Sequence, residues 1–254
     1  MRISRTVLAA WSSSFALLLI GVHAWASSLD ERFTEANRLY REGKFDKAAS
    51  AYQALVSGGI ASSSLFYNLG NATVKTGEFA KAVLAYERSL RENPRDPEAR
   101  ANLEYTRGLL SDRVEDPGVL ALVERFSPTQ WLSWRENLWG FVLCYWAGAL
   151  LGVVGIVLRR RWKGILVAAF VLLGVAIPLG AVLFLRSGLW AQPRAIVMAK
   201  EAEVRYGPVL GESTAFTLHE GSKVRVLRSA GDWVQILFAK GKVGWVPAEA
   251  IEKI

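Results

Sequence analysis

Hydrophobic and polar positions follow three patterns along the chain, and each pattern predicts a different structure. Residues 138–158 and 165–185 are two runs without a charged side chain, and each is long enough to cross about 30 Å of hydrocarbon as a helix. From residue 195 onward, short runs alternate with period two and are punctuated by glycine, which predicts a small β-barrel. Between residues 29 and 110 the sequence repeats itself at a fixed interval, as helical solenoids do.

The repeat in the N-terminal part has an interval of 34 residues. Five identical pairs stand in register, namely Gly43/Gly77, Phe45/Phe79, Lys47/Lys81, Ala48/Ala82 and Tyr52/Tyr86. The period and these residue types resemble the tetratricopeptide repeat (TPR), in which two antiparallel helices per unit pack through small residues. The resemblance implies an α-helical TPR solenoid of about two and a half units over residues 27–110, in which residues 96–110 form a capping helix.

The TPR resemblance also implies a concave wall made by the first helix of each unit. Amide and aromatic side chains on such a wall suit an extended or helical peptide, because asparagine can bond its backbone and rings can cover its apolar side chains. A spacer that only separates other domains is the alternative. The residues expected on the concave wall are Phe33, Asn37, Tyr40, Arg41, Tyr67, Asn68, Asn71, Lys75, Asn102 and Tyr105.

A C-terminal carboxylate is not the expected ligand of this wall. The TPR proteins that grip such a carboxylate need basic residues at positions that Phe33 and Glu98 occupy here. Asn37 and Asn68 match that group, but the charge does not.

The C-terminal segment carries an ordered set of turns and tryptophans. Residues 202–208, 218–221, 231–233 and 241–246 resemble a bacterial SH3-type domain, and the resemblance covers nearly all of residues 195–254. Such domains are often linked to peptidoglycan or peptide binding. The alternative is that both tryptophans are core residues of a barrel too small to spare them. The residues expected to form a groove with an aromatic floor and one acidic wall are Tyr206, Asp232, Trp233 and Trp245.

The two uncharged runs predict a transmembrane hairpin with helices at 137–158 and 165–186 and a short loop at 159–164. Neither run holds an acidic or basic side chain, which argues against an ion path. Residues 187–194 are expected to be a linker. The loop residues that mark the cytoplasmic side by the positive-inside rule are Arg159, Arg160, Arg161 and Lys163.

A connector at residues 111–136 precedes the hairpin. Ser127 and Pro128 predict the start of an interfacial helix, as N-cap and first helical residue. Trp131, Trp134 and Trp139 fit an aromatic belt at the membrane surface, and a tryptophan-lined ligand site is the alternative.

Residues 1–26 have the pattern of a secretory signal peptide. Arg2 and Arg5 precede an apolar stretch, and Ala24-Trp25-Ala26 ends it with small residues. An uncleaved anchor is the alternative, and either one exports the residues that follow. Together with the cytoplasmic loop, this predicts a multi-pass protein of the bacterial inner membrane with both soluble domains in the periplasm.

Composition excludes several classes of function. With one cysteine, Cys144, and two histidines, His23 and His219, a disulfide framework or a Cys/His zinc site cannot form within one chain. We expect no catalytic residue, metal or cofactor. The net charge of +8 gives no support to nucleic-acid binding, because the excess flanks the predicted spans. Those charges are Arg159, Arg160, Arg161, Lys163 and Arg186.

The order of the parts resembles the BatE-type proteins of bacterial aerotolerance (Bat) operons. The resemblance implies membrane partners with von Willebrand factor A domains, a MoxR-type ATPase, and a part in envelope integrity or oxidative-stress tolerance. The sequence therefore predicts a non-enzymatic membrane scaffold that binds partner proteins. A peptidoglycan-binding protein that docks through the SH3-type domain is the alternative.

Overall fold

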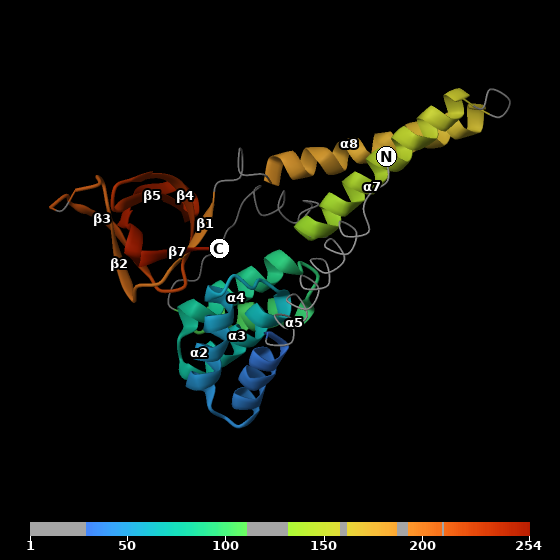
Figure 1. Cartoon of the computed structure of the whole chain (residues 1–254). Coiled ribbons are helices and arrows are strands. Elements are labelled where there is room, and N and C mark those ends of the chain that lie inside the picture. Colours follow the sequence, from blue (N-terminus) through green and yellow to red (C-terminus); the bar gives the residue numbers. More distant parts are fainter. Residues whose placement is uncertain (1–28, 111–131, 158–161, 187–192, 210) are drawn as a thin grey trace, which may run out of the picture.

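The computed structural model of the protein describes residues 29–110, 132–157, 162–186, 193–209 and 211–254. Figure 1 shows a helical block, a hairpin of two long helices and a curved antiparallel sheet. A helical N-terminal part, two apolar helices and a C-terminal sheet were all predicted. The predicted signal segment, Ser127, Trp131 and three arginines of the predicted loop, Arg159, Arg160 and Arg161, lie outside the described residues.

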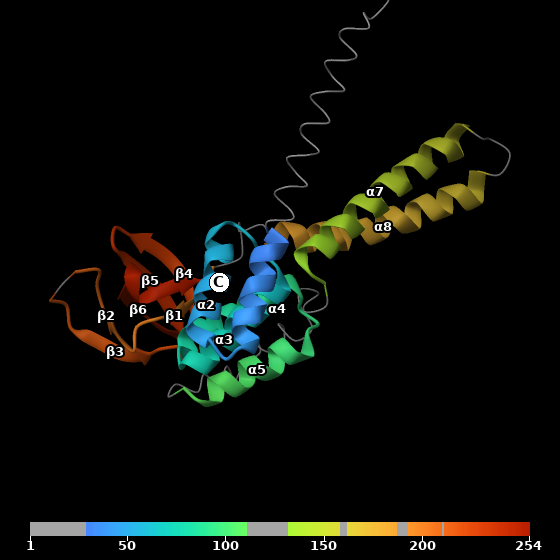
Figure 2. The same cartoon turned by 60° about the horizontal axis from the view of Figure 1, so that its bottom comes forward.

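The helical block is a row of short helices in which each helix packs against the next (Figure 2). Residues 29–41 are helical, and α2 (Phe45–Ser57), α3 (Ser63–Thr76), α4 (Phe79–Glu92) and α5 (Pro97–Gly108) follow. Asp96 starts α5, because its carboxylate accepts hydrogen bonds from the backbone N–H groups of Glu98 and Ala99 at 3.0 and 3.1 Å.

Residues 34 positions apart have equivalent places in the helical block. Gly43 and Gly77 both follow a helix with a positive φ, 74° and 80°, and an added Cβ would meet no atom within 4 Å at either. The left-handed backbone therefore explains this repeated glycine. A different cause acts at Gly70, where an added Cβ would lie 2.6 Å from Cε1 of the buried Tyr86 ring. Tyr52 is the buried counterpart of Tyr86 in the preceding repeat.

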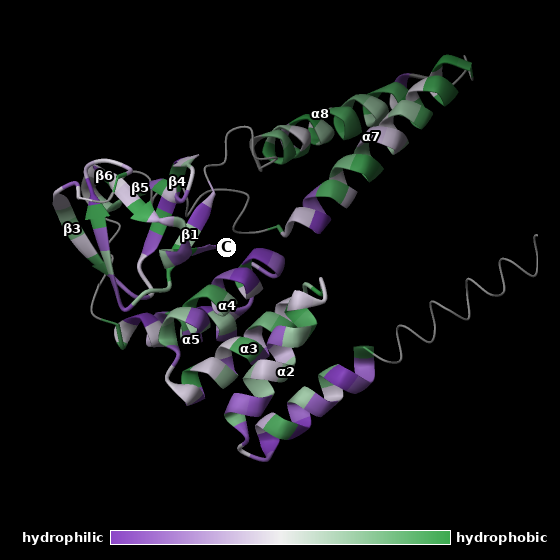
Figure 3. Ribbon diagram, turned by 60° about the vertical axis from the view of Figure 1, so that its left-hand side comes forward, coloured by the Kyte–Doolittle hydropathy of each residue, from purple (hydrophilic) through white to green (hydrophobic). Residues whose placement is uncertain are grey.

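The hairpin consists of α7 (Trp134–Val157) and α8 (Trp162–Arg186), which pack along their length. Both helices are long and apolar enough to cross a membrane, with mean hydropathies of 2.1 and 2.7 over their most apolar stretches. Hydrophobic residues cover them almost throughout (Figure 3). Close packing needs glycine, since a Cβ at Gly148 would lie 2.9 Å from Cγ of Leu173.

The helix α7 begins three residues before the predicted span. Ser133 and Glu136 form a capping box, in which the Ser133 hydroxyl accepts from the Glu136 N–H at 3.2 Å and the Glu136 carboxylate accepts from the Ser133 N–H at 2.9 Å. The other helix, α8, begins inside the predicted loop, so that Lys163 lies within its first turn.

The sheet contains β1 (Arg194–Val197), β2 (Glu201–Arg205), β3 (Thr214–His219), β4 (Lys223–Ala230), β5 (Trp233–Phe238), β6 (Lys242–Pro247) and β7 (Ile251–Lys253), with 3-10 turns η2 (Ala239–Gly241) and η3 (Ala248–Ala250). All pairings are antiparallel in the order β3-β2-β6-β5-β4-β1-β7. Aliphatic side chains such as Val204, Leu218, Ile236 and Val246 fill the core. Gly244 is required where it stands, because a Cβ there would lie 2.4 Å from Cγ1 of Val204.

The sheet packs directly on the helical block, which the sequence did not predict. Ile196 of β1 is fully buried in one hydrophobic cluster with Val83 and Leu84 of α4 and Leu103 of α5. This cluster closes the end of the helical block, so that β1 and β7 cover the surface on which a further helix of the repeat would stack. We call the residues of α4 and α5 at this contact the docking face. They are Val83, Leu84, Glu87, Arg88, Arg91, Leu103 and Arg107.

Charged groups complete the docking face. The Glu87 carboxylate, in a side chain only 12% exposed, accepts two hydrogen bonds of 2.8 Å from Nζ of Lys223 and also pairs with Arg107. Burial alone would raise the pKa of Glu87, but the neighbouring charges of Lys223 and Arg107 outweigh it and hold that pKa below its ordinary value. Arg88 pairs with Glu252 at 2.9 Å and donates to the Lys253 carbonyl oxygen at 2.6 Å.

Candidate functional site

Two asparagine–tyrosine triads lie on the face of the helical block that the first helix of each repeat forms. In the first triad, Oδ1 of Asn37 accepts hydrogen bonds from the Tyr52 hydroxyl at 2.7 Å and from Nδ2 of Asn68 at 3.0 Å. In the second, Oδ1 of Asn71 accepts from the Tyr86 hydroxyl at 2.7 Å and from Nδ2 of Asn102 at 2.9 Å. Each member of the second triad stands 34 residues after its counterpart, so the network is part of the repeat.

The triads use only part of the hydrogen-bonding capacity of their amides. Within the described part of the chain, Nδ2 of Asn37 and Asn71 and Oδ1 of Asn68 and Asn102 take part in no hydrogen bond. These asparagines are half-buried, and none of their spare groups is fully buried. Each repeat therefore presents one spare donor and one spare acceptor, which is the pattern that a peptide backbone offers in return.

The tyrosines act as fixed supports of the two triads. Burial raises the pKa of Tyr52 to about 12 and raises that of Tyr86 as well, so both hydroxyls keep their proton and donate. Neither tyrosine was among the residues predicted for the site. Their signal was available, because a tyrosine follows each accepting asparagine by 15 residues.

The other residues expected on the concave wall fall into different environments. Tyr67 joins the second triad, because its hydroxyl donates to Glu98 at 3.1 Å and accepts from Nδ2 of Asn102 at 3.4 Å. Phe33 packs on Tyr52, with ring centroids 6.0 Å apart. The remaining predicted residues have no part in the triads: Tyr40 packs against Phe45, whereas Arg41, Lys75 and Tyr105 are exposed.

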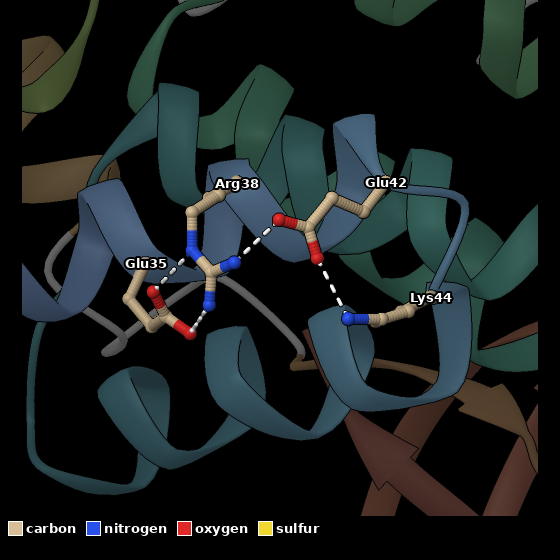
Figure 4. Close-up of polar contacts among 4 residues, drawn as sticks. All are labelled: Glu35, Arg38, Glu42 and Lys44. Carbon is tan, nitrogen blue, oxygen red and sulfur yellow. Dashed lines mark hydrogen bonds and ion pairs between the residues drawn. The ribbon is translucent and has the colours of Figure 1, made fainter.

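Charged residues near the first helix pair among themselves. Arg38 bridges Glu35, at 2.6 Å, and Glu42, and Lys44 contacts Glu42 at 2.8 Å, as Figure 4 shows. Exposed pairs of this kind contribute little to stability. They link side chains in the second half of the helix at 29–41 with those of the turn that follows it, and they leave the triads as the polar feature that repeats.

On the sheet, the two predicted groove tryptophans lie outside the aliphatic core cluster. The Arg205 guanidinium lies 5.7 Å from the Trp233 ring centroid, and the Arg228 guanidinium lies 5.0 Å from that of Trp245. Trp245 is only 5% exposed, while Trp233 is half-buried. An arginine therefore lies over each tryptophan ring, an arrangement that stabilises the ring through cation–π attraction.

The other two groove residues are open to solvent. Tyr206 is 69% exposed and Asp232 is also exposed. The backbone carbonyl of Asp232 accepts from the Ala248 N–H at 2.8 Å, which fastens the β4–β5 turn to η3. This face combines aromatic surface with the charges of Asp232 and Arg205, so its charge is mixed, whereas we expected one acidic wall.

The described residues contain no group of three or more His, Cys, Asp or Glu side chains that could hold a metal ion.

Comparison with known proteins identifies the C-terminal part. Residues 200–252 match the family described as bacterial SH3 domain. The chain is 36% identical over 63 residues to the putative N-acetylmuramoyl-L-alanine amidase YrvJ of Bacillus subtilis (strain 168). That match spans 25% of this chain but only 12% of the amidase. The C-terminal SH3 domain of myosin IB from Entamoeba histolytica aligns over 25% of this chain and 95% of its own length, at 16% identity and a TM-score of 0.18. Residues 200–252 are thus a bacterial SH3 domain.

Proposed function

We propose that the protein is a membrane-anchored, non-enzymatic scaffold that binds partner proteins through its helical repeat and its bacterial SH3 domain. The observation that carries the proposal is the pair of asparagine–tyrosine triads. In each triad, one amide oxygen accepts the internal hydrogen bonds. One amide donor and one amide acceptor stay unused, and they lie at the same position of successive repeats. An extended peptide has donors and acceptors at regular intervals and satisfies both.

The proposal includes a TPR-type fold for the helical block. The 34-residue period, the buried Ala48 and Ala82, and the contact of Gly70 with Tyr86 support it. A TPR-type fold and the order of the parts together support membership of the BatE-type group. The partners on this proposal are envelope proteins such as membrane proteins with von Willebrand factor A domains, in tolerance of aerobic or oxidative stress.

The proposed location is the bacterial inner membrane, with α7 and α8 as spans and both soluble parts in the periplasm. Hydropathy and the arginines of the loop support this orientation. The ion pair of Arg95 with Glu136 joins the helical block to the first turn of α7, so on either orientation the block lies at this end of the span. The block then stands directly over the membrane surface.

Site-specific photocrosslinking in living cells tests the scaffold proposal. A photoreactive phenylalanine at Tyr67 is expected to capture a defined envelope protein, whereas one at the exposed Lys47 of α2 captures none. Asn71→Asp keeps the oxygen that accepts from Tyr86 and Asn102 but removes the spare donor, so it should abolish capture at Tyr67. Capture that is equal at both positions, or that is unchanged by Asn71→Asp, would contradict the proposal.

Peptidoglycan binding through the SH3 domain is the second candidate, and the partial match to the amidase favours it. The full-length protein in nanodiscs should sediment with purified cell-wall sacculi. Tyr206→Ala should release it, because this side chain is the most exposed aromatic of the groove, and Tyr105→Ala on α5 serves as the control. Sedimentation that Tyr206→Ala leaves unchanged would rule out this groove.

A further inference from the structure

One row of side chains crosses the neighbouring strands β4, β5, β6 and β2 of the SH3 domain, on the face of the sheet opposite the aliphatic core. Each member of the row is paired with the next across the ladder, and the members are Arg228, Gln235, Trp245 and Arg205. Val234, Ile236 and Val246 alternate with them along the strands and lie in the core cluster. A guanidinium group therefore belongs to each end of the row.

Both arginines reach across a strand toward the middle of the row. Arg228 starts on β4, but its guanidinium carbon lies 5.0 Å from the ring centroid of Trp245 on β6. Arg205 starts on β2, and its guanidinium carbon lies 5.7 Å from the ring centroid of Trp233 on β5. Trp233 stands two residues before Gln235 on β5, so the two indole rings belong to diagonal neighbours. Two positive groups are thus brought together over adjacent tryptophans.

The positive charge of Arg228 is not matched by a negative one. Within the described part of the chain Arg228 forms no ion pair, and its Nε donates to Oε1 of Gln235 at 2.8 Å. Arg205 shows which group such a guanidinium accepts here, because it pairs with a carboxylate oxygen of Glu203 at 3.0 Å. Arg225 of β4 adds further positive charge one row along. A guanidinium held by a ring and by its Nε still presents two terminal nitrogens, which match a carboxylate.

We propose that Arg228, stacked over Trp245, binds a free carboxylate of the stem peptides of peptidoglycan. The inference rests on the second candidate function, peptidoglycan binding through this domain, and names the chemical group that is recognised. Stem peptides carry free carboxylates beside small residues with methyl groups. The carboxylate meets the exposed guanidinium of Arg228, and the methyl group lies against the half-buried ring of Trp233.

The neighbouring acidic groups favour an isolated carboxylate over an acidic protein segment. Glu203 already pairs with Arg205 beside the row, and the exposed Asp232 directly precedes Trp233. A segment with several adjacent carboxylates would bring further negative charge close to both, and like charges repel. One carboxylate at Arg228 avoids that cost.

Binding of a labelled stem peptide tests the proposal. A pentapeptide with the sequence of a stem peptide and a dye on its N-terminus is titrated with the full-length protein in nanodiscs, and its fluorescence anisotropy is measured. A second peptide differs only in that its carboxylates are converted to amides. The free-acid peptide should bind about tenfold more tightly or better, because the amide cannot form the charged hydrogen bonds.

Matched variants locate the effect at Arg228. Arg228→Gln should lower the affinity for the free-acid peptide by the same factor and leave that for the amide nearly unchanged, because both changes remove the same ion pair. Arg32→Gln, the same substitution at an exposed position of the helix at 29–41, should change neither affinity. Equal melting temperatures of the two variants control for their folding.

Several outcomes would overturn the proposal. They are no binding of the free-acid peptide, equal affinities for the two peptides, and an affinity for the free-acid peptide that Arg228→Gln does not change. Tighter binding of an oligoglutamate peptide would also overturn it, because the ligand would then be an acidic protein segment.

The wider peptidoglycan proposal fails or stands separately, through the sedimentation with sacculi. Sedimentation that Tyr206→Ala abolishes and Arg228→Gln leaves unchanged would support that proposal and overturn this one. Stem-peptide binding that depends on Arg228, without sedimentation, would support this inference and contradict binding of the intact wall.

Discussion

At the residue scale, the hydrogen bond from the Tyr86 hydroxyl to Asn71 is the triad contact whose loss is easiest to measure. Tyr86→Phe removes the bond to Oδ1 of Asn71 without changing the buried ring, and one such hydrogen bond contributes about 1 kcal/mol. We expect a lower melting temperature by differential scanning fluorimetry. Tyr105→Phe is the control, because that side chain is 64% exposed. Equal melting temperatures for wild type and Tyr86→Phe would show that the triad adds no stability.

Gly70 and Gly108 give opposite expectations for the same substitution. Gly70→Ala puts a Cβ 2.6 Å from the buried Tyr86 ring, and overpacking of this kind costs about 1–3 kcal/mol. Gly108→Ala meets nothing within 4 Å and gains helix propensity, worth up to about 1 kcal/mol. Melting temperatures should fall for the first variant and hold or rise for the second. A fall of equal size in both would contradict the close packing at Gly70.

At the element scale, the limits of several helices and strands were predictable because local chemistry sets them. Asp96 and Pro97 start α5, and Gly77 ends α3, as caps and left-handed glycine do in any context. The start of α7 was placed three residues late. An absence of charge predicted the span, whereas the capping box of Ser133 and Glu136 starts the helix in a polar sequence.

The two helices of the hairpin carry a prediction of topology. Reporter enzymes that work only outside the cytoplasm are fused after Arg160 and after residue 254 of the full-length chain. The fusion after Arg160 should be inactive and the one after residue 254 active, because the arginines of the loop favour the cytoplasmic side. Two active or two inactive fusions would exclude an antiparallel pair of spans.

At the scale of the whole molecule, the contact between Glu87 and Lys223 couples the two soluble parts. Glu87→Gln leaves Lys223 and Arg107 without their carboxylate, and we expect a cost of about 1–3 kcal/mol for leaving these donors without a charged partner. Thermal unfolding of the full-length protein at neutral pH should show the loss. Glu104→Gln, on the exposed side of α5, is the matched control.

The same pair predicts a pH dependence. The pKa of Glu87 is held below its ordinary value of 4.5, so its contribution to stability is complete above that value and is lost as the pH falls through the lowered pKa. The difference in melting temperature between wild type and Glu87→Gln should therefore shrink in acid and persist at neutral pH. A difference that does not change with pH would mean that the charge of Glu87 has no role in docking.

This coupling was beyond sequence reasoning. Glu87, Arg88 and Arg91 have the pattern of a solvated helix face, and their partners in the C-terminal part lie more than 130 positions later in the chain. Period and composition report on neighbours along a helix or strand, and no such pattern connects α4 with β1, β4 and β7. The groove tryptophans were located on the correct domain, but their covering arginines come from other strands and were likewise missed.

The position of the SH3 domain on α4 and α5 limits how the repeat can lengthen. A duplicated unit inserted before α2 would leave the docking face intact and add one more triad. A duplicated unit inserted after α5 would move β1 and β7 away from Val83 and Leu103 and leave Glu87 without Lys223. Longer relatives of this protein are therefore expected to have gained their units at the N-terminal end.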